Sequence, residues 1–443
     1  MASGRHILII DDDALVASVY KEQLEAQGYT AEIATDGRTG FYRIQETGPD
    51  GVLLDLMLPE INGVEILKKI RAQKRFQKLP ILALSNGFMV NLLNDAVEAG
   101  ATKVFNKATM SPRDVVAALS SALLPMLPAE FMGTGGVPMV LPKPAASDDS
   151  DPKPAAPPVS PNPSNSLPPL RMRGETAAGD SPASESKKAS SPPTPNDSEQ
   201  LQADLRQRLL SNAKTVCTSL RQGLTQCDRR TAAPEQAQAL AEMCRSVHSL
   251  TGNAAVSAWA NLAHFSSAVE ALLKELSQRP EKINASSKLT LRQAIDAIGR
   301  LVEKGEQARR WGGSKVLVVD ADVICRETLR SALELADLPS IIVGDPELAL
   351  KLAQENSFDL VFLDVDMPET NGYALCERIR AFPANQKTSV VFVTVLDDVE
   401  HRTLATRSGG QDFIAKPFLL VEMAVKALTY LSMKEPEKLQ KAA

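Results

Sequence analysis

The sequence is poor in the residues that build disulfide frameworks and metal clusters. It has 443 residues but only five cysteines and four histidines. The cysteines form neither a CxxC pair nor a cluster with histidine; they are Cys217, Cys227, Cys244, Cys325 and Cys376. An odd number of scattered cysteines is typical of reduced thiols in a cytoplasmic protein, and it excludes a zinc-finger or disulfide-stapled architecture.

Long hydrophobic runs are also missing. The N-terminal segment Met-Ala-Ser-Gly-Arg-His lacks the apolar core of a signal peptide. The most apolar tract, residues 115–141, is interrupted by Pro125, Pro128 and a glycine-rich stretch, so no apolar run reaches membrane length. We therefore expect a cytoplasmic protein without membrane insertion.

The chain also lacks an excess of positive charge. It carries 49 Lys and Arg against 54 Asp and Glu, a net charge of −5, so its composition does not indicate a nucleic-acid partner. No glycine-rich nucleotide lid, kinase ATP-binding pattern or helix-turn-helix is recognisable. We therefore expect no nucleic-acid partner, no kinase ATP-binding domain and no enzymatic activity of the chain's own.

One pattern of residues is present twice. A short apolar run ends at Asp55 and is followed by Pro59 and Asn62-Gly63, and the same pattern surrounds Asp364, 309 residues later (364 − 55). The same offset joins five further pairs: Asp11 and Asp320, Pro59 and Pro368, Gly63 and Gly372, Ser85 and Thr394, Lys107 and Lys416. We interpret this register as two copies of one domain.

Within each copy, strand-like and helix-like segments alternate. In the first copy they fall at 6–10, 15–27, 31–34, 38–46, 52–55, 64–71, 81–84, 92–99 and 102–106, with a last helix from Ser111-Pro112. Five strand–helix units in about 120 residues predict an α/β flavodoxin-like, doubly wound parallel sheet, in which the site lies beyond the carboxyl ends of the strands. The alternation returns from about residue 315 to about 431.

The composition changes between the two copies. Residues 125–197 are rich in Pro, Ser and Ala and predict a disordered linker. Residues 198–310 have helical periodicity and predict an all-α four-helix bundle, with helices at 202–224, 234–253, 258–276 and 289–308. The expected parts of the chain are therefore 1–124, 125–197, 198–310, 311–432 and a charged tail at 433–443.

The strand ends bring acidic side chains together. Asp11, Asp12 and Asp55 all follow predicted strands, and carboxylates gathered at one sheet edge raise each other's pKa. A hydrated Mg²⁺ held by oxygen ligands would relieve that repulsion. An aspartate beside the cation can then attack a phosphoryl group, while Lys107 and Ser85 stabilise the developing charge. Strand-end aspartates often merely cap helices and lysines are usually solvated, but the complete set occurs twice.

On these motifs, residues 6–122 and 315–431 resemble the receiver domains of two-component response regulators. The resemblance implies that Asp55 and Asp364 are phosphoacceptors. It implies that Mg²⁺ is held in the first copy by Asp11, Asp12, Asp55 and the backbone of Met57, and in the second by Asp320, Asp364 and the backbone of Asp366. The residues that contact the phosphoryl group or switch with it would be Ser85, Lys107, Thr394, Lys416 and Phe413.

Each copy departs from the receiver pattern. In the first, Ala108 replaces the proline that follows the lysine, so we expect a trans Lys107-Ala108 bond, and Val104 occupies the position of the switch aromatic. In the second, Ala321 replaces a metal-binding acid, with Asp322 and Asp366 as nearby candidates to compensate. Since loss of an outer-sphere partner already weakens metal binding by roughly 10–100-fold, we expect phosphorylation chiefly on the first copy.

The middle region contains one informative stretch, Val247–Ala255. On a helix, Gly252 lies one turn beyond His248 on the same face and lets another protein approach the imidazole. A solvent-facing neutral imidazole accepts and donates phosphoryl groups. The stretch resembles a histidine phosphotransfer (HPt) domain, although Thr251 replaces its lysine and Ala258 a later glycine. The alternative is a surface histidine on a helical spacer.

These expectations combine into a phosphorelay signalling protein. It would take phosphoryl groups from a partner histidine kinase and act on other phosphorelay or output proteins. The alternative is a scaffold or adaptor whose degenerate receivers dock partners without phosphotransfer. Asp364-Val365-Asp366 also mimics the DxD of haloacid-dehalogenase phosphatases, but those enzymes need the aspartate on the first strand and Asp364 follows the third. His264 is assigned no role.

Overall fold

The computed structural model describes residues 4–123, 195–229, 233–305, 311–368, 370–395 and 399–434. The predicted linker lies outside the described residues except for 195–197, which already belong to a helix. Proline at a first helical position has its backbone angle preset, so Pro195 begins this helix within the predicted linker. Almost all of the predicted tail, from 435 on, is also outside.

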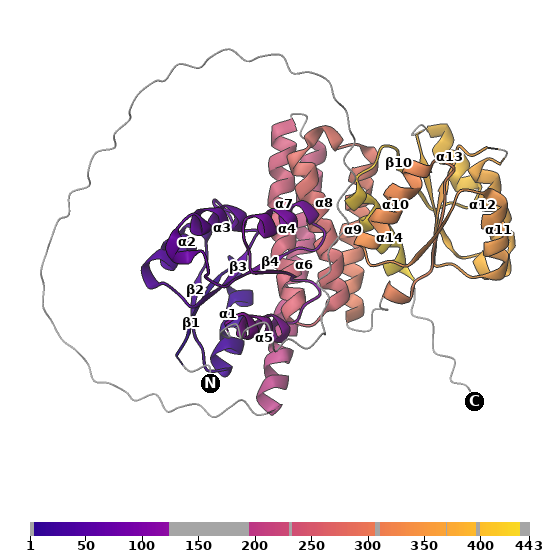
Figure 1. Cartoon of the computed structure of the whole chain (residues 1–443). Helices are drawn as coiled ribbons and strands as arrows, with labels where there is room; N and C mark the ends of the chain where they lie inside the picture. The colour runs from indigo at the N-terminus through magenta and orange to yellow at the C-terminus, as the bar shows by residue number, and fades with distance from the viewer. Residues whose placement is uncertain are drawn as a thin grey trace, which may run out of the picture. The chain divides into compact units, whose positions relative to one another are not determined.

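Residues 4–123 form an α/β domain, called here the N-terminal domain (Figure 1). Its elements are β1 (His6–Ile10), α1 (Ala14–Ala26), β2 (Thr30–Ala34), α2 (Gly37–Thr47), β3 (Gly51–Asp55), α3 (Gly63–Arg71), β4 (Ile81–Ser85), α4 (Val90–Glu98), β5 (Lys103–Asn106) and α5 (Pro112–Leu123). The strands are parallel in the order β2-β1-β3-β4-β5. The predicted doubly wound sheet is therefore confirmed.

Helices cover both faces of this sheet, so both faces are buried. Successive residues of each strand point to opposite faces. Ile7 and Ile9 of β1 pack with α1 and α5, whereas Leu8 and Ile10 pack with α3 and α4. In Figure 1, α1 and α5 accordingly lie on one side of the sheet and α2, α3 and α4 on the other.

Residues 311–434 form the C-terminal domain. Its elements are β6 (Val316–Val319), α10 (Val323–Leu335), β7 (Ser340–Val343), α11 (Pro346–Glu355), β8 (Leu360–Asp364), α12 (Gly372–Ala381), β9 (Ser389–Thr394), α13 (Val399–Arg407), β10 (Asp412–Ala415) and α14 (Leu420–Met433). The strand order β10-β9-β8-β6-β7 is that of the first sheet. Every element begins within one residue of the position that the 309-residue offset predicts.

The turn after the third strand explains the repeated Asn-Gly. Asn62 caps α3 by accepting a hydrogen bond from the backbone N–H of Glu65 at 2.9 Å. A Cβ on Gly63 would collide with the backbone oxygen of Asp55, and one on Gly372 with that of Asp364. Glycine therefore lets this loop fold back over the end of the strand that carries the aspartate.

The middle of the chain is helical, as predicted. This helical region comprises α6 (Pro195–Arg229), α7 (Ala233–Val256), α8 (Ala260–Gln278) and α9 (Ala285–Lys304). Helix α9 begins four residues before its predicted start because Asn284 and Ser287 form a capping box, with reciprocal bonds of 2.8 and 3.0 Å. Ala258, between α7 and α8, has φ 61°, the left-handed conformation that glycine adopts without strain.

Helix α14 joins the C-terminal domain to the helical region by packing on α8 and α9. Lys426 is fully buried there and donates to Asp412 at 2.8 Å, which also accepts from the Tyr430 hydroxyl at 2.9 Å. Nearby, Ser286 of α9 donates to Glu422 at 2.8 Å. The Lys426–Asp412 pair therefore fixes α14 within its own domain, and the bond from Ser286 to Glu422 joins that helix to the helical region.

His264 lies in the same junction. One of its ring nitrogens is 3.0 Å from the backbone oxygen of Ala336, and its ring packs between Phe88 and Trp311. Burial lowers the pKa of His264. This residue is a packed histidine, which agrees with the absence of an assigned role.

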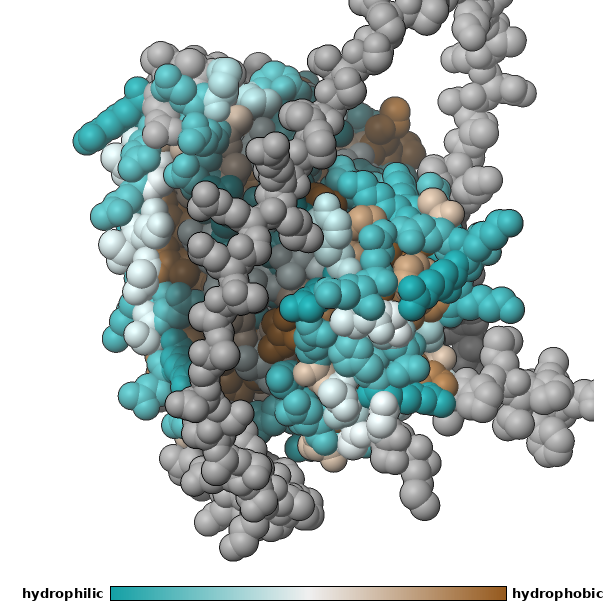
Figure 2. All heavy atoms as spheres, turned by 90° about the vertical axis from the view of Figure 1, so that its left-hand side faces the viewer, coloured by the Kyte–Doolittle hydropathy of each residue, from teal (hydrophilic) through white to brown (hydrophobic). Residues whose placement is uncertain are grey.

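None of the described helices is long and apolar enough to span a bilayer. The described part of the face in Figure 2 is mainly hydrophilic, with hydrophobic patches of limited extent.

We expect Lys426→Met to destabilise the packing of α14 in the C-terminal domain by about 3–5 kcal/mol, because it leaves the Asp412 carboxylate buried without its cation. Hydrogen exchange of the α14 amides measures this free energy of opening. Lys351→Met, at an exposed position of α11, is the matched control and should leave it unchanged. Equal protection of α14 in both variants would contradict the role of the ion pair.

Candidate functional site

The acidic pocket of the N-terminal domain is built around one buried cation. Lys107, which follows β5, donates to Asp11 at 2.8 Å and to Asp55 at 2.7 Å. All three side chains are nearly inaccessible to solvent. The carboxyl ends of three parallel strands therefore place the predicted residues together, as the fold requires.

The two aspartates differ in electrostatic environment. Burial, reinforced by Asp55, raises the pKa of Asp11 to about 6 although Lys107 opposes this. Burial would also raise the pKa of Asp55, but Lys107 and His248 outweigh it and hold this pKa below its ordinary value. Burial would lower the pKa of Lys107, but its two carboxylate partners raise it. The charged form is therefore favoured more strongly at Asp55 than at Asp11.

The donor set fits the divalent cation that the sequence predicts. Asp12 and Asp55 offer carboxylate oxygens that lie, with a nitrogen of His248, within 4.8 Å of one another. Burial and the neighbouring Asp55 raise the pKa of Asp12, so the pair holds negative charge that a cation would neutralise. Oxygen ligands of this kind suit Mg²⁺.

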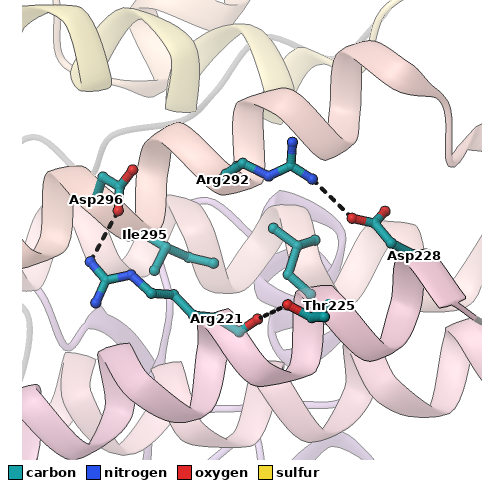
Figure 3. Close-up of a pocket in the computed structure, with 7 residues that line it drawn as sticks. Arg221, Thr225, Asp228, Arg292, Ile295 and Asp296 are labelled. Atoms are coloured by element: carbon teal, nitrogen blue, oxygen red, sulfur yellow. Dashed lines mark hydrogen bonds and ion pairs between the residues drawn. The ribbon is translucent and has the colours of Figure 1, made fainter.

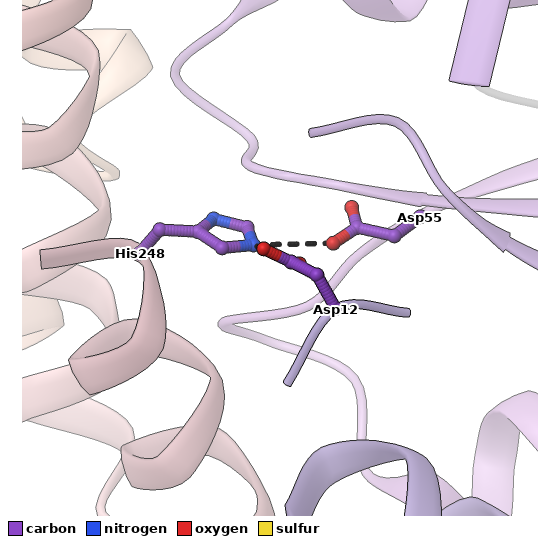
Figure 4. Close-up of side chains that lie close together, drawn as sticks. All are labelled: Asp12, Asp55 and His248. Atoms are coloured by element: carbon purple, nitrogen blue, oxygen red, sulfur yellow. Dashed lines mark hydrogen bonds and ion pairs between the residues drawn. The ribbon is translucent and has the colours of Figure 1, made fainter. Parts of the chain in front are cut away.

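His248 of α7 points directly at the predicted phosphoacceptor (Figure 4). Its Nε2 is 3.1 Å from Oδ2 of Asp55 and 3.8 Å from Oδ1 of Asp12, while its Nδ1 is 2.7 Å from Oε1 of Glu270. Two segments 193 residues apart in the sequence thus meet at one oxygen atom.

The expectation of a solvent-facing, neutral imidazole is wrong for this arrangement. The side chain of His248 is only 11% exposed. Burial alone would lower the pKa of His248, but the carboxylates of Glu270 and Asp55 outweigh it and raise this pKa well above 6.5. The physical reason is that α7 packs against α1, so the N-terminal domain covers the histidine.

Around His248, the helical region and the N-terminal domain also meet at one close apolar approach and at two further side-chain contacts. A Cβ on Gly252 would lie 2.8 Å from a methyl group of Val16, so the glycine admits an approaching surface as predicted, and that surface belongs to the same chain. Ser249 donates to Asp13 at 2.9 Å, and the Lys274 amine lies 2.7 Å from the sulfur of Met57.

Glu270 and Asn86 complete the site, and neither was assigned a role from the sequence. Glu270, on α8 and fully buried, accepts from His248 with one oxygen and from Asn86 with the other, at 3.0 Å. Asn86 directly follows Ser85 at the end of β4. The available signal was a polar residue at a strand end of the first copy where the second copy has Val395.

Two departures from the family patterns have structural consequences. Thr251 does not stand in for the missing lysine, because its hydroxyl is buried and donates to the backbone oxygen of Val247 at 3.0 Å. The lysine of the helical region that reaches the edge of the acidic pocket is Lys274, which contacts Met57. Among the described residues the one cis peptide bond is Lys416-Pro417, so the Lys107-Ala108 bond is trans, as predicted.

The acidic pocket of the C-terminal domain is less complete. Lys416 pairs with Asp320 at 2.8 Å and with Asp364 at 3.2 Å, and burial and Asp320 raise the pKa of Asp364. Asp322 caps α10 through the N–H of Ile324 at 2.9 Å, and the side chain of Asp366 is exposed. Thr394 is buried at the end of β9, and Phe413 is half-buried on β10. Among the described residues, no group of metal-binding side chains like that of Asp12 and Asp55 gathers at this pocket.

A separate cavity of about 250 Å³ lies between α6 and α9 (Figure 3). Its charges neutralise each other: Arg221 pairs with Asp296 at 3.0 Å, and Arg292 with Asp228 at 2.9 Å. We assign it no chemistry.

Comparison with known proteins identifies the two α/β domains. Residues 7–120 and 316–427 match the family described as "Response regulator receiver domain". "Protein RcaC" of Microchaete diplosiphon is 31% identical over 163 residues, which cover 35% of this chain and 24% of that protein. "Response regulator MprA" of Mycolicibacterium vanbaalenii is 36% identical over 95 residues, covering 21% and 40%. "Alkaline phosphatase synthesis transcriptional regulatory protein PhoP" of Bacillus subtilis is 30% identical over 120 residues, covering 27% and 49%. The chain thus spans less than half the length of these relatives.

Solved structures give matches of one domain's length. A putative response regulator from Chloroflexus aurantiacus has 29% identity and a TM-score of 0.26, over 27% of this chain and 97% of that one. The receiver domain of HemR from Leptospira biflexa has the same identity and TM-score, over 28% and 99%.

We expect Glu270→Gln to lower the pKa of His248, because it removes one of the two negative charges that raise it. Titration of selectively labelled imidazole by NMR, in the full chain without divalent ions, measures the midpoint. Because the pKa of His248 is raised in the docked state, docking should be favoured below pH 6.5 and weaken as the pH rises through the docked midpoint. Glu275→Gln on the same helix is the control, and an unchanged midpoint in Glu270→Gln would contradict the assignment.

We also expect the full chain to bind divalent metal at one acidic pocket. Asp12→Asn should weaken Mn²⁺ binding, followed by electron paramagnetic resonance, by roughly 10–100-fold or more. Asp322→Asn, a helix cap at the C-terminal domain, should not. Ala321→Asp should create a second site. Two sites of equal affinity in the unmodified chain would show that the C-terminal pocket needs no further carboxylate.

Proposed function

The chain belongs to the response regulator receiver family, whose two copies make up just over half of it, and from this premise we propose a phosphorelay protein in which Asp55 and His248 exchange a phosphoryl group within one chain. The observation that carries the proposal is the 3.1 Å separation between Oδ2 of Asp55 and Nε2 of His248. The two groups already face each other in a largely buried site, so the imidazole needs only to move back far enough for a phosphoryl group to stand between Nε2 and Oδ2.

The transfer is a displacement at phosphorus. As the bond from Nε2 of His248 to phosphorus forms, the bond from Oδ of Asp55 breaks and the aspartate leaves as a carboxylate; the reverse reaction phosphorylates Asp55. Nε2 needs a free lone pair, so its proton passes to solvent before attack. Glu270 holds the proton on Nδ1, at 2.7 Å, and so selects the tautomer whose Nε2 is the nucleophile.

The surrounding charges suit the transferred group. Lys107 is bonded to Asp55 and is positioned to neutralise phosphoryl oxygens, and the Ser85 hydroxyl lies at the end of the adjacent strand. Mg²⁺, for which Asp12, Asp55 and the Met57 backbone carbonyl are the proposed ligands, would supply further positive charge to those oxygens.

The helical region acts in this proposal as an HPt-like four-helix bundle. The phosphoryl group comes from a partner histidine kinase in the cytoplasm, because no kinase ATP-binding pattern is recognisable in the sequence. Output passes to other phosphorelay or regulatory proteins through protein contacts, without nucleic-acid binding or an enzymatic activity of its own.

A scaffold function remains the second candidate, and one observation favours it for the C-terminal domain. That domain lacks the carboxylate at Ala321 and is fixed to the helical region through the buried helix α14. We propose that the C-terminal domain is mainly structural, while Asp55 is the principal phosphoacceptor.

We expect the full chain, given acetyl phosphate and Mg²⁺, to accumulate base-stable, acid-labile phosphohistidine at His248. Asp55→Asn should reduce this label at least about 10-fold, because the phosphoryl group reaches His248 through Asp55. Asp364→Asn is the matched control and should leave the label in place. A wild-type signal no greater than that of His248→Gln would refute the relay.

A further inference from the structure

Asn86, in the loop after β4, contacts the helical region through both the nitrogen and the oxygen of its side-chain amide. Its amide nitrogen donates to the backbone oxygen of Ser267 at 2.6 Å and to Oε2 of Glu270 at 3.0 Å. Its amide oxygen accepts from the Ser267 hydroxyl and from the backbone N–H of Phe88. Asn86 is 4% exposed, and Ser267 and Glu270 are fully buried.

This network fixes the orientation of the Asn86 amide. The nitrogen faces two acceptors, the Ser267 carbonyl and the Glu270 carboxylate, and the oxygen faces two donors. Turning the amide over would place like groups together at every contact except that with the Ser267 hydroxyl, which can also accept. Asn86 therefore supplies a donor that no other described side chain gives to this oxygen of Glu270.

The same carboxylate also holds His248. Glu270 uses one oxygen for Nδ1 of His248 and the other for Asn86. Its hydrogen bonding is complete only when the N-terminal domain is docked, so the domain that carries Asp55 also completes the group that orients its nucleophile.

Comparison with the C-terminal domain shows which docking contacts could distinguish one receiver domain from the other. At the 309-residue offset, Asp13 corresponds to Asp322, and Met57 to Asp366, which would offer Lys274 a carboxylate. Asp322 and Asp366 would therefore permit a C-terminal domain to dock on the helical region in the same way. Asn86 corresponds to Val395, which cannot donate and would leave the second oxygen of Glu270 buried without a partner.

We propose that Asn86 is the specificity-determining residue by which the helical region recognises the N-terminal domain, and that it positions His248 through Glu270. Receivers with a hydrogen-bond donor directly after the Ser or Thr that ends the fourth strand are accepted. Receivers with an apolar residue there, such as the C-terminal domain of a second copy, are rejected. The functional consequence rests on the phosphotransfer proposed above, whereas the docking itself does not.

The energetic argument is the asymmetry of buried hydrogen bonds. A bond to a charged group contributes modestly when it is made, but a buried carboxylate oxygen left without a donor bears the whole loss of hydration. Leu205 and Val256 of the helical region belong to the same apolar core as Val16 of the N-terminal domain, and apolar packing depends less sharply on the exact partner than a buried polar contact does. Discrimination therefore falls on the polar pair.

Docking is measured without phosphate in the full chain carrying Lys274→Cys and Met57→Cys, treated with a short bismaleimide. We expect Asn86→Val to lower the yield of this crosslink about 10-fold or more. Val395→Asn, the reverse exchange at the equivalent exposed position, is the matched control and should leave the yield unchanged. Full crosslinking of the Asn86→Val chain would overturn the proposal.

Asn86→Asp separates the donor from the loop structure. It keeps the oxygen that accepts from Phe88 but replaces the donor with a second carboxylate facing Glu270. We expect it to abolish the crosslink and Glu270→Gln to restore part of it, because the new amide can donate across the interface while still accepting from His248. Independent, additive effects of the two substitutions would overturn the proposed pairing.

Phosphohistidine at His248 is measured on the same variants. Loss of both crosslink and label in Asn86→Val supports the inference. A crosslink that depends on Asn86 in a chain that never forms phosphohistidine would refute the relay and leave the recognition intact, so the two failures are distinguishable.

Discussion

A single imidazole between two buried carboxylates organises this protein. His248 faces Asp55 on one side and Glu270 on the other, and Lys107 balances Asp55 from within the N-terminal domain. Each charge is tolerated in the interior because its partner is at hydrogen-bond distance. Separating the helical region from the N-terminal domain would break the contact between His248 and Asp55 together with that between Asn86 and Glu270. In the phosphotransfer proposed above, this interface is also the reaction site.

Two copies of one fold are used in different ways. The N-terminal domain meets the helical region through the carboxyl edge of its sheet, with α1 against α7. The C-terminal domain meets it through α14, whose Lys426 and Glu422 are buried there. The carboxyl edge of the N-terminal sheet carries the acidic pocket, so a phosphoryl group could pass across that contact to the helical region. Helix α14 lies on the flank of its domain, so its contact can only be structural. The predicted metal-binding acid is present in the N-terminal domain as Asp12, whereas Ala321 stands in its place in the C-terminal domain. This difference agrees with the two uses of the fold.

Resemblance to HPt domains located the histidine but misjudged its surroundings. The glycine one turn beyond His248 does admit a partner, namely Val16 of the same chain. Thr251, in the position of the family's lysine, turns into the helical region, and Lys274 from the next helix lies near the pocket instead. Ala258, in the position of a glycine, keeps the left-handed backbone that the turn requires. The geometry is retained where the residue type is not.

The sequence by itself determined the two doubly wound sheets and the residues at the strand ends, because alternating periodicity and the 309-residue register encode local structure directly. It also located Asp55, Lys107 and His248 as reactive candidates. Tertiary structure alone decided that Asp55 and His248 meet, that Glu270 and Asn86 complete the contact, and that the histidine is covered and lies between carboxylates that raise its pKa. These pairs join segments far apart in the chain, and their meeting depends on how whole surfaces pack, which no local pattern records.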